Sequence, residues 1–257
     1  MSRRLFIAGN WKMNKTVTEA IQLADALKRS CMDYASVDIA VAPTSLAIGA
    51  VSQRLQHTNI FVSAQHMHQA ASGAYTGEIS GEMIRSAGAE YVIIGHSERR
   101  SIFGETDNDV QQKIDSAFKT GLLPILCVGE TLEERESGSA FSIVMNQLKV
   151  AMANLSPDQA AAVTIAYEPV WAIGTGKTAT PDQAQQMHAE IRQWLLQNYP
   201  SFVAKQVRIQ YGGSVKPHNA AILLSQPDVD GALVGGAALN SDSFTAIVKA
   251  AEDTNKV

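Results

Sequence analysis

Short runs of apolar and β-branched residues recur along the whole chain and alternate with stretches that have a helical pattern. Each run is bounded by glycine, proline or polar residues, as buried strands are. The runs cover residues 5–8, 37–42, 60–64, 91–94, 122–128, 163–167, 207–211 and 231–234. Eight such units without a linker or a low-complexity segment favour a closed (β/α)8 barrel (the TIM-barrel class of α/β fold) over an open doubly wound sheet. We therefore expect residues 1–257 to form a single barrel domain.

Signals for helix starts lie between several of these runs. Residues 180–183 (TPDQ) combine an N-cap threonine, a proline at the first helical position and a capping-box glutamine. Residues 156–159 (SPDQ) repeat this pattern, and residues 16–19 (TVTE) give a further capping box. These signals predict helices that begin soon after residues 16, 156 and 180.

Composition and charge exclude several classes of protein. The net charge is −4 and the chain has no basic run, which argues against a nucleic-acid partner. No apolar stretch reaches the ~18 residues of a membrane span, and the amino terminus lacks the apolar core of a signal peptide. Two cysteines are too few for a disulfide framework. We therefore expect a soluble cytoplasmic protein that binds neither nucleic acid nor membrane.

In a (β/α)8 barrel the active site lies at the carboxyl ends of the strands. The loops at these ends hold a cation at Lys12, an imidazole at His96 and a carboxylate at Glu168. Glycine pairs at 212–213 and 235–236 follow the last two predicted strands, and exposed backbone N–H groups at such positions bind anions such as phosphate. A carboxylate base beside an imidazole and an ammonium suits proton abstraction next to a carbonyl, because the developing oxyanion needs donors.

The loop after the sixth predicted strand has a stiff beginning and a glycine-rich end. Pro169 fixes its own φ angle and restricts Glu168 before it. Gly174 and Gly176 can adopt backbone angles that are closed to other residues. This pattern predicts a base at the root of a lid that folds over a bound ligand.

Five motifs carry these residues: 10–12 (NWK), 95–99 (GHSER), 167–176 (YEPVWAIGTG), 211–214 (YGGS) and 234–236 (VGG). Their order and spacing closely resemble those of the triosephosphate isomerase family, and the resemblance covers essentially the whole chain. Two places differ from the pattern expected of that family. Residues 65–68 read QHMH, and Ala238 stands where a serine is common.

The resemblance implies reversible conversion of dihydroxyacetone phosphate into D-glyceraldehyde 3-phosphate through an enediolate, without a metal or an organic cofactor. It implies that Glu168 moves the carbon-bound proton, His96 polarises the carbonyl and Lys12 supplies positive charge. The other site residues that it implies are Asn10 as a donor beside the lysine, Glu98 and Ser97 in support, Gly174, Ser214, Gly235 and Gly236 for the phosphate, and Tyr211 with Ser214 to hold the closed lid.

The segment 69–78 is too long for an ordinary turn between a strand and a helix, and it carries an aromatic residue at Tyr75. Long ordered loops in compact domains are usually functional. The resemblance implies that this segment reaches into a second subunit and places Thr76 near Asn10 and Lys12 there. It therefore predicts a homodimer with an isologous interface.

Other interpretations of the same residues remain open at this point. One is a Schiff-base aldolase of phosphosugars with Lys12 as the nucleophile. Another is a catalytically silent phosphate-binding scaffold, although such a protein would usually have lost Glu168, His96 or Lys12. The alternating His66 and His68 suggest a metal pair, but the other candidate site residues contain no further cluster of metal ligands.

Overall fold

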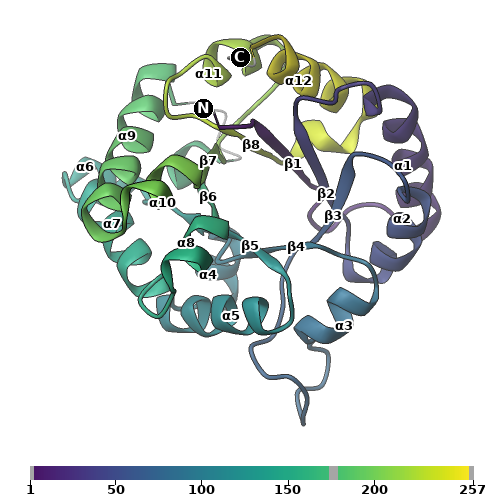
Figure 1. The fold of residues 1–257 in the computed structure, drawn as a ribbon, viewed down its shortest axis with the longest axis horizontal. Helices are drawn as coiled ribbons and strands as arrows, with labels where there is room; N and C mark the ends of the chain where they lie inside the picture. Colours follow the sequence, from purple (N-terminus) through teal and green to yellow (C-terminus); the bar gives the residue numbers. More distant parts are fainter. Residues whose placement is uncertain (1–2, 174–178, 255–257) are drawn as a thin grey trace.

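The chain forms a closed barrel of parallel strands surrounded by helices, as the sequence predicts (Figure 1). The structure is a computed structural model that describes residues 3–173 and 179–254. The strands follow one another around the barrel in chain order, and β8 closes it by pairing with β1. They are β1 (Phe6–Asn10), β2 (Asp38–Ala42), β3 (Ile60–Ala64), β4 (Tyr91–Ile94), β5 (Leu123–Val128), β6 (Thr164–Tyr167), β7 (Arg208–Tyr211) and β8 (Gly231–Val234).

Helices connect each strand to the next on the outside of the barrel (Figure 1). The α-helices are α1 (Val17–Cys31), α2 (Ile48–Arg54), α3 (Gly81–Ser86), α4 (Ser97–Phe103), α5 (Asp107–Lys119), α6 (Leu132–Glu136), α7 (Ala140–Ala151), α8 (Pro157–Ala162), α9 (Pro181–Asn198), α10 (Ser201–Gln206), α11 (Pro217–Leu224) and α12 (Ser241–Thr254). The 3₁₀ turns are η1 (Ser45–Ala47), η2 (Val170–Ala172) and η3 (Gly236–Leu239).

The three predicted helix starts are confirmed. Thr16, Ser156 and Thr180 are the N-caps of α1, α8 and α9, and each forms a complete capping box with the residue three positions later. Such a cap typically contributes ~1 kcal/mol, because it satisfies backbone N–H groups that the first helical turn leaves without partners.

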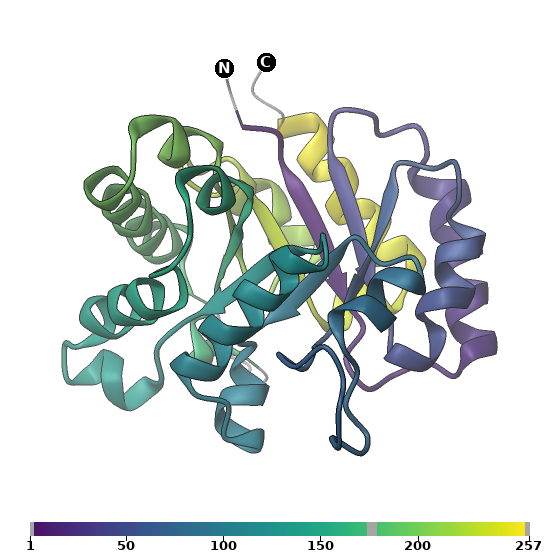
Figure 2. The ribbon, with the colours of Figure 1, turned by 60° about the horizontal axis from the view of Figure 1, so that its bottom comes forward.

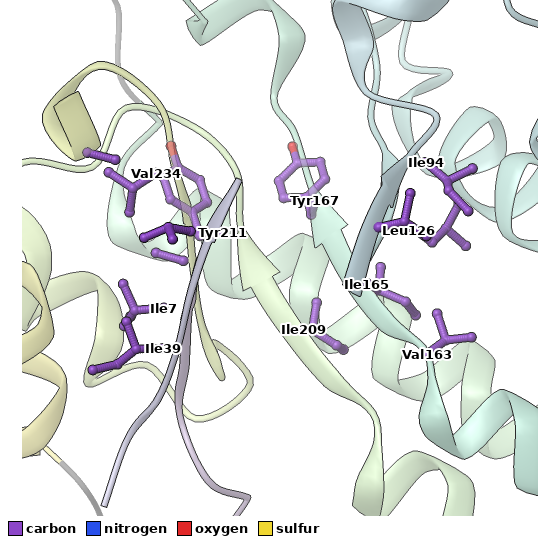
Figure 3. Packing of buried hydrophobic residues seen from close by; sticks show 14 of the residues in the cluster. Ile7, Ile39, Ile94, Leu126, Val163, Ile165, Tyr167, Ile209, Tyr211 and Val234 are labelled. Carbon is purple, nitrogen blue, oxygen red and sulfur yellow. The ribbon is translucent and has the colours of Figure 1, made fainter. Parts of the chain in front are cut away.

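The core has two layers because successive side chains of a strand point to opposite faces. Phe6, Ala40 and Ile93 belong to the cluster that fills the barrel. Ile7 and Ile39 belong to the larger cluster between the strands and the surrounding helices, part of which Figure 3 shows. The barrel is therefore a packed core and not a pore, and ligands must bind at its ends.

The loop after β3 stands out from the rest of the molecule. Residues 69–79, which we call the arm, project beyond the carboxyl ends of the strands, while β1 begins at the opposite end of the barrel (Figure 2). Among the described residues, no helix is both long and apolar enough to cross a membrane. The arm extends from the same end of the barrel at which we expect the active site.

Candidate active site

A cavity of about 720 Å³ lies over the carboxyl ends of the strands. It brings together nearly all the site residues that the sequence predicts, from five different strand–helix units. These residues are Asn10, Lys12, His96, Ser97, Glu98, Glu168, Ser214, Gly235 and Gly236. Thr76 and Tyr211 do not line the cavity, and Gly174 lies outside the described residues.

Glu168 follows β6 directly and is almost completely buried. The backbone N–H of Ser97 donates to its Oε2 at 2.9 Å, and the Ser97 hydroxyl donates to Oε1 at 3.2 Å. Nε2 of His96 lies 3.0 Å from the same Oε1. The first turn of α4 therefore holds the carboxylate beside the imidazole, and both side chains are buried.

His96 is the N-cap of α4, and this position defines its protonation pattern. The backbone N–H of Glu98 donates to His96 Nδ1 at 3.2 Å, so Nδ1 carries a lone pair. In the neutral ring the proton is then on Nε2, the nitrogen that faces Glu168. His96 can thus present a neutral N–H donor to a ligand in the cavity.

Lys12 has a left-handed backbone with φ of 50°, which is uncommon for a residue other than glycine. Its N–H donates to Oδ1 of Asn10 at 3.0 Å, and its carbonyl accepts from Nε2 of Gln65 at 2.8 Å. Its ammonium contacts Oε1 of Glu98 at 2.7 Å. These contacts support the conformation that directs the ammonium to the cavity. This role of Gln65 is not predicted from the sequence.

The two glycine pairs form one wall of the cavity. A Cβ atom on Gly213 would lie 2.2 Å from the Tyr211 hydroxyl, so only glycine fits against that side chain. A Cβ on Gly236 would meet no atom within 4 Å, so this backbone is open toward the cavity. Together with Ser214, these loops offer small groups and backbone N–H donors to an anion.

The predicted lid covers residues 169–179, of which 174–178 lie outside the described residues. Its beginning is held by Glu130, a fully buried carboxylate after β5. Its Oε1 accepts hydrogen bonds from the Tyr167 hydroxyl (3.0 Å), Trp171 Nε1 (2.9 Å) and Arg135 Nη1 (3.0 Å). Burial raises the pKa of Tyr167, and the nearby charge of Glu130 raises it further, so the phenol stays a donor. Glu130 follows the fifth predicted strand, and its role is not predicted from the sequence.

The chain matches the family model described as triosephosphate isomerase over residues 5–251. The chain belongs to the triosephosphate isomerase family. It is 54% identical over 247 residues to the triosephosphate isomerase of Carboxydothermus hydrogenoformans, covering 96% of this chain and 98% of that protein. It is 50% identical to that of Endomicrobium trichonymphae over 96% and 98%, and 49% identical to that of Acetivibrio thermocellus over 97% and 99%. It is thus an isomerase of triose phosphates.

The sequence differs from the expected pattern of triosephosphate isomerases at Ala238, which lies in the core, and at residues 65–68, which lie beside the arm. Ala238 is fully buried, and a Cβ added to Gly9 would lie 3.0 Å from its Cβ, so the two residues pack closely. Residues 65–68 form the base of the arm. Within the described ranges, no group of three or more His, Cys, Asp or Glu residues is arranged to hold a metal ion.

Proposed function

We propose that Glu168 and His96 are the acid–base pair with which this enzyme interconverts dihydroxyacetone phosphate and D-glyceraldehyde 3-phosphate. The observation that carries the assignment is the 3.0 Å approach of His96 Nε2 to Glu168 Oε1 at one wall of the cavity. Glu168 removes a carbon-bound proton and returns it to the neighbouring carbon. His96 donates from Nε2 to the carbonyl oxygen, so that the enediolate forms beside a neutral donor, as in the established mechanism of the family.

Glu168 has to leave Ser97 before it can act as a base. Both of its oxygens accept hydrogen bonds from Ser97 in this structure, so the carboxylate is held on α4 and not on a substrate carbon. Substrate binding and closure of the lid would move the carboxylate from α4 to the substrate. Because Glu168 immediately precedes the lid, a change at Pro169 is transmitted directly to the base.

Lys12 provides the positive charge in this proposal. Its ammonium lines the cavity, and Asn10 beside it offers an amide that can donate to a substrate oxygen. Glu98 holds the ammonium in place at 2.7 Å. A fixed cation near the developing enediolate stabilises the transition state more than the ground state, which is the condition for catalysis.

We assign phosphate binding to the loops after β7 and β8 and to the tip of the lid. Ser214, Gly235 and Gly236 line the cavity and can donate backbone N–H bonds, and Gly174 joins them by resemblance. Tyr211 lies behind the glycine wall. Burial raises the pKa of its phenol to about 12, although an interaction with the backbone of Ala179 lowers this pKa in part. Its phenol is therefore available to hold the second stem of the lid.

The Schiff-base alternative is disfavoured by the setting of Lys12. An amine nucleophile must be uncharged, whereas Lys12 is ion-paired with Glu98. The silent-scaffold alternative is disfavoured because Glu168, His96 and Lys12 are present and share one cavity. Borohydride treatment in the presence of substrate tests the aldolase directly, and we expect no covalent adduct at Lys12.

We further propose that the barrel is the single domain of the chain and that two copies form an isologous homodimer. Large apolar side chains are exposed on the arm and on the loops and helices that follow β1 to β4, namely Met13, Leu46, Tyr75, Met83, Ile102 and Phe103. Exposed apolar groups of this kind mark protein interfaces when they gather on one surface. In the dimer the arm would bring Thr76 to Asn10 and Lys12 of the second subunit. Sedimentation should show a dimer, and a fully active monomer would contradict it.

The residue assignments are tested by a coupled assay run from each triose phosphate in turn. We expect turnover in both directions without added metal or organic cofactor and in the presence of a chelator. Glu168→Gln should abolish it, and loss of activity on chelation would contradict the proposal. We also propose that the protein is cytoplasmic and acts in glycolysis and gluconeogenesis. Cell fractionation tests its location.

A further inference from the structure

The arm is held to the barrel mainly at its base. The backbone N–H of His68 donates to the carbonyl of Ile79 at 2.9 Å, and His68 forms an isolated parallel bridge with Ser80. The His68 ring also packs on Tyr75, with ring centroids 4.1 Å apart. Residues 71–78 are exposed. The orientation of the arm therefore depends on the contacts at its two ends.

His66 joins the two ends of the arm to the barrel. Its Nε2 lies 2.9 Å from Oε2 of Glu78, close to the returning end of the arm. Its Nδ1 lies 3.5 Å from Nζ of Lys113 on α5. In the neutral ring with the proton on Nε2, the imidazole donates to Glu78 and accepts from the Lys113 ammonium. Both ring nitrogens are satisfied only in this protonation state.

A second proton on His66 would have to be placed on Nδ1, facing the Lys113 ammonium. Glu105 lies 3.8 Å from Nδ1, but Lys113 and Arg99 both already bind that carboxylate. Glu78 and Glu105 therefore attract the added charge, while Lys113 and Arg99 repel it. The ring is also partly buried, and burial together with the charge of Lys113 lowers the pKa of His66 below its usual value of 6.5.

The lowered pKa determines the direction of the pH effect. A base with a lower pKa in the folded state binds fewer protons when folded than when its contacts are released. The contacts of His66 thus stabilise the attachment of the arm fully above pH 6.5. Their contribution is lost as the pH falls from 6.5 through the lower pKa of the folded state.

We propose that neutral His66, through its contacts with Glu78 and Lys113, latches the base of the arm, and that its protonation loosens the arm. Because the arm is the part that reaches the partner subunit, association of the subunits weakens in mildly acidic solution. The second part of this inference rests on the homodimer proposed above. The first part concerns one chain alone and can be tested separately.

The protonation of His66 is tested by following its ring nitrogens by NMR between pH 8 and pH 5. We expect a neutral ring with the proton on Nε2 near pH 7.5 and a midpoint below 6.5. Glu78→Gln keeps an acceptor for Nε2 but removes a negative charge, so it should move the midpoint further down. A wild-type midpoint at or above 6.5, or an unchanged midpoint in Glu78→Gln, would overturn the latch.

Subunit association is tested by sedimentation at pH 7.5 and pH 5.5 for the wild type, His66→Asn and His57→Asn. The amide oxygen of Asn at position 66 can take the place of Nδ1 as the acceptor from Lys113, and the amide does not titrate. His57 is exposed and has φ of 62°, a conformation that Asn accepts well, so His57→Asn is the matched control.

We expect the dissociation constant of the wild type and of His57→Asn to rise severalfold at pH 5.5, and that of His66→Asn to stay nearly constant. Equal pH dependence in the wild type and His66→Asn would overturn the latch while leaving the dimer intact. A chain that is monomeric at both pH values would contradict the dimer, and the NMR titration would then decide the latch alone.

Discussion

The imidazole Nε2 of His96 lies 3.0 Å from Oε1 of Glu168, although the two residues are on separate strand–helix units. The same carboxylate accepts two hydrogen bonds from Ser97 at the start of α4. One short element, α4, thus positions both the electrophile and the base. Because these groups are so close, we expect activity to depend on the length of the Glu168 side chain as well as on its charge.

Glu168→Asp should lower kcat by ~100-fold, because one methylene fewer withdraws the carboxylate by roughly an ångström from a well-aligned site. Glu168→Gln keeps the shape but loses the base, so its loss should be larger. Steady-state kinetics on both substrates measures the effect, and circular dichroism checks that the fold is intact. Wild-type activity in Glu168→Asp would show that another residue is the base.

Lys12→Met should abolish activity without unfolding the protein, because the substitution removes the charge of a partly exposed side chain. Lys12→Arg should retain some activity with a higher KM, since guanidinium keeps the charge but differs in shape from an ammonium. The comparison of the two variants separates charge from geometry. Similar kinetics in Lys12→Met and Lys12→Arg would show that the charge of Lys12 does not contribute to catalysis.

Deleting residues 173–176 should change the products as well as the rate. An enediolate phosphate that is open to water can eliminate phosphate instead of regaining a proton. The shortened enzyme should therefore turn over slowly and release more methylglyoxal and free phosphate than the wild type. A phosphate assay beside the isomerase assay measures both. Slow turnover without extra phosphate would leave the lid with a positioning role only.

His188 should make the stability of the protein pH-dependent. The ring is fully buried, Nδ1 lies 3.2 Å from the Asp228 carbonyl, and burial lowers the pKa of His188 to about 4. The unfolded chain binds a proton near pH 6.5, so stability is lost as the pH falls from 6.5 to 4, by ~3 kcal/mol in total.

The titration of His188 is measured by urea unfolding at pH 7 and pH 4.5 in the wild type and His188→Gln. Glutamine lacks the titrating ring, so the free energy of unfolding should fall less between the two pH values in the variant. This comparison removes the contribution of the carboxylates that protonate in both proteins. Parallel losses in the two proteins would contradict the assignment.

The sequence was sufficient to predict the barrel because its strands are marked by local signals. The runs at 60–64 and 91–94 coincide with β3 and β4, and capping residues such as Thr180 start helices where expected. The predicted end of the first strand, at residue 8, is two residues short of the end of β1. β1 extends to Asn10 because Gly9 and Asn10 pair with β2, and neither residue type indicates a strand by itself.

Other parts of the site depend on contacts that only the closed barrel creates. Gln65 reaches the carbonyl of Lys12 across more than fifty positions of sequence, and Glu130 accepts from Trp171 in the next loop. No local pattern marks such a contact. The role of Ser97 in holding Glu168 depends likewise on β4 and β6 being brought together around one cavity.

The central claim is that Glu168 carries a proton between two carbons through an enediolate, and isotope incorporation tests it most directly. Dihydroxyacetone phosphate is converted in D₂O, and the product is trapped and analysed by NMR. A carboxylate exchanges its proton with solvent, so we predict deuterium at C2 of glyceraldehyde 3-phosphate with the wild type and no conversion with Glu168→Gln. Conversion by Glu168→Gln at the wild-type rate and with the same deuterium content would contradict the account, because another group would then carry the hydrogen.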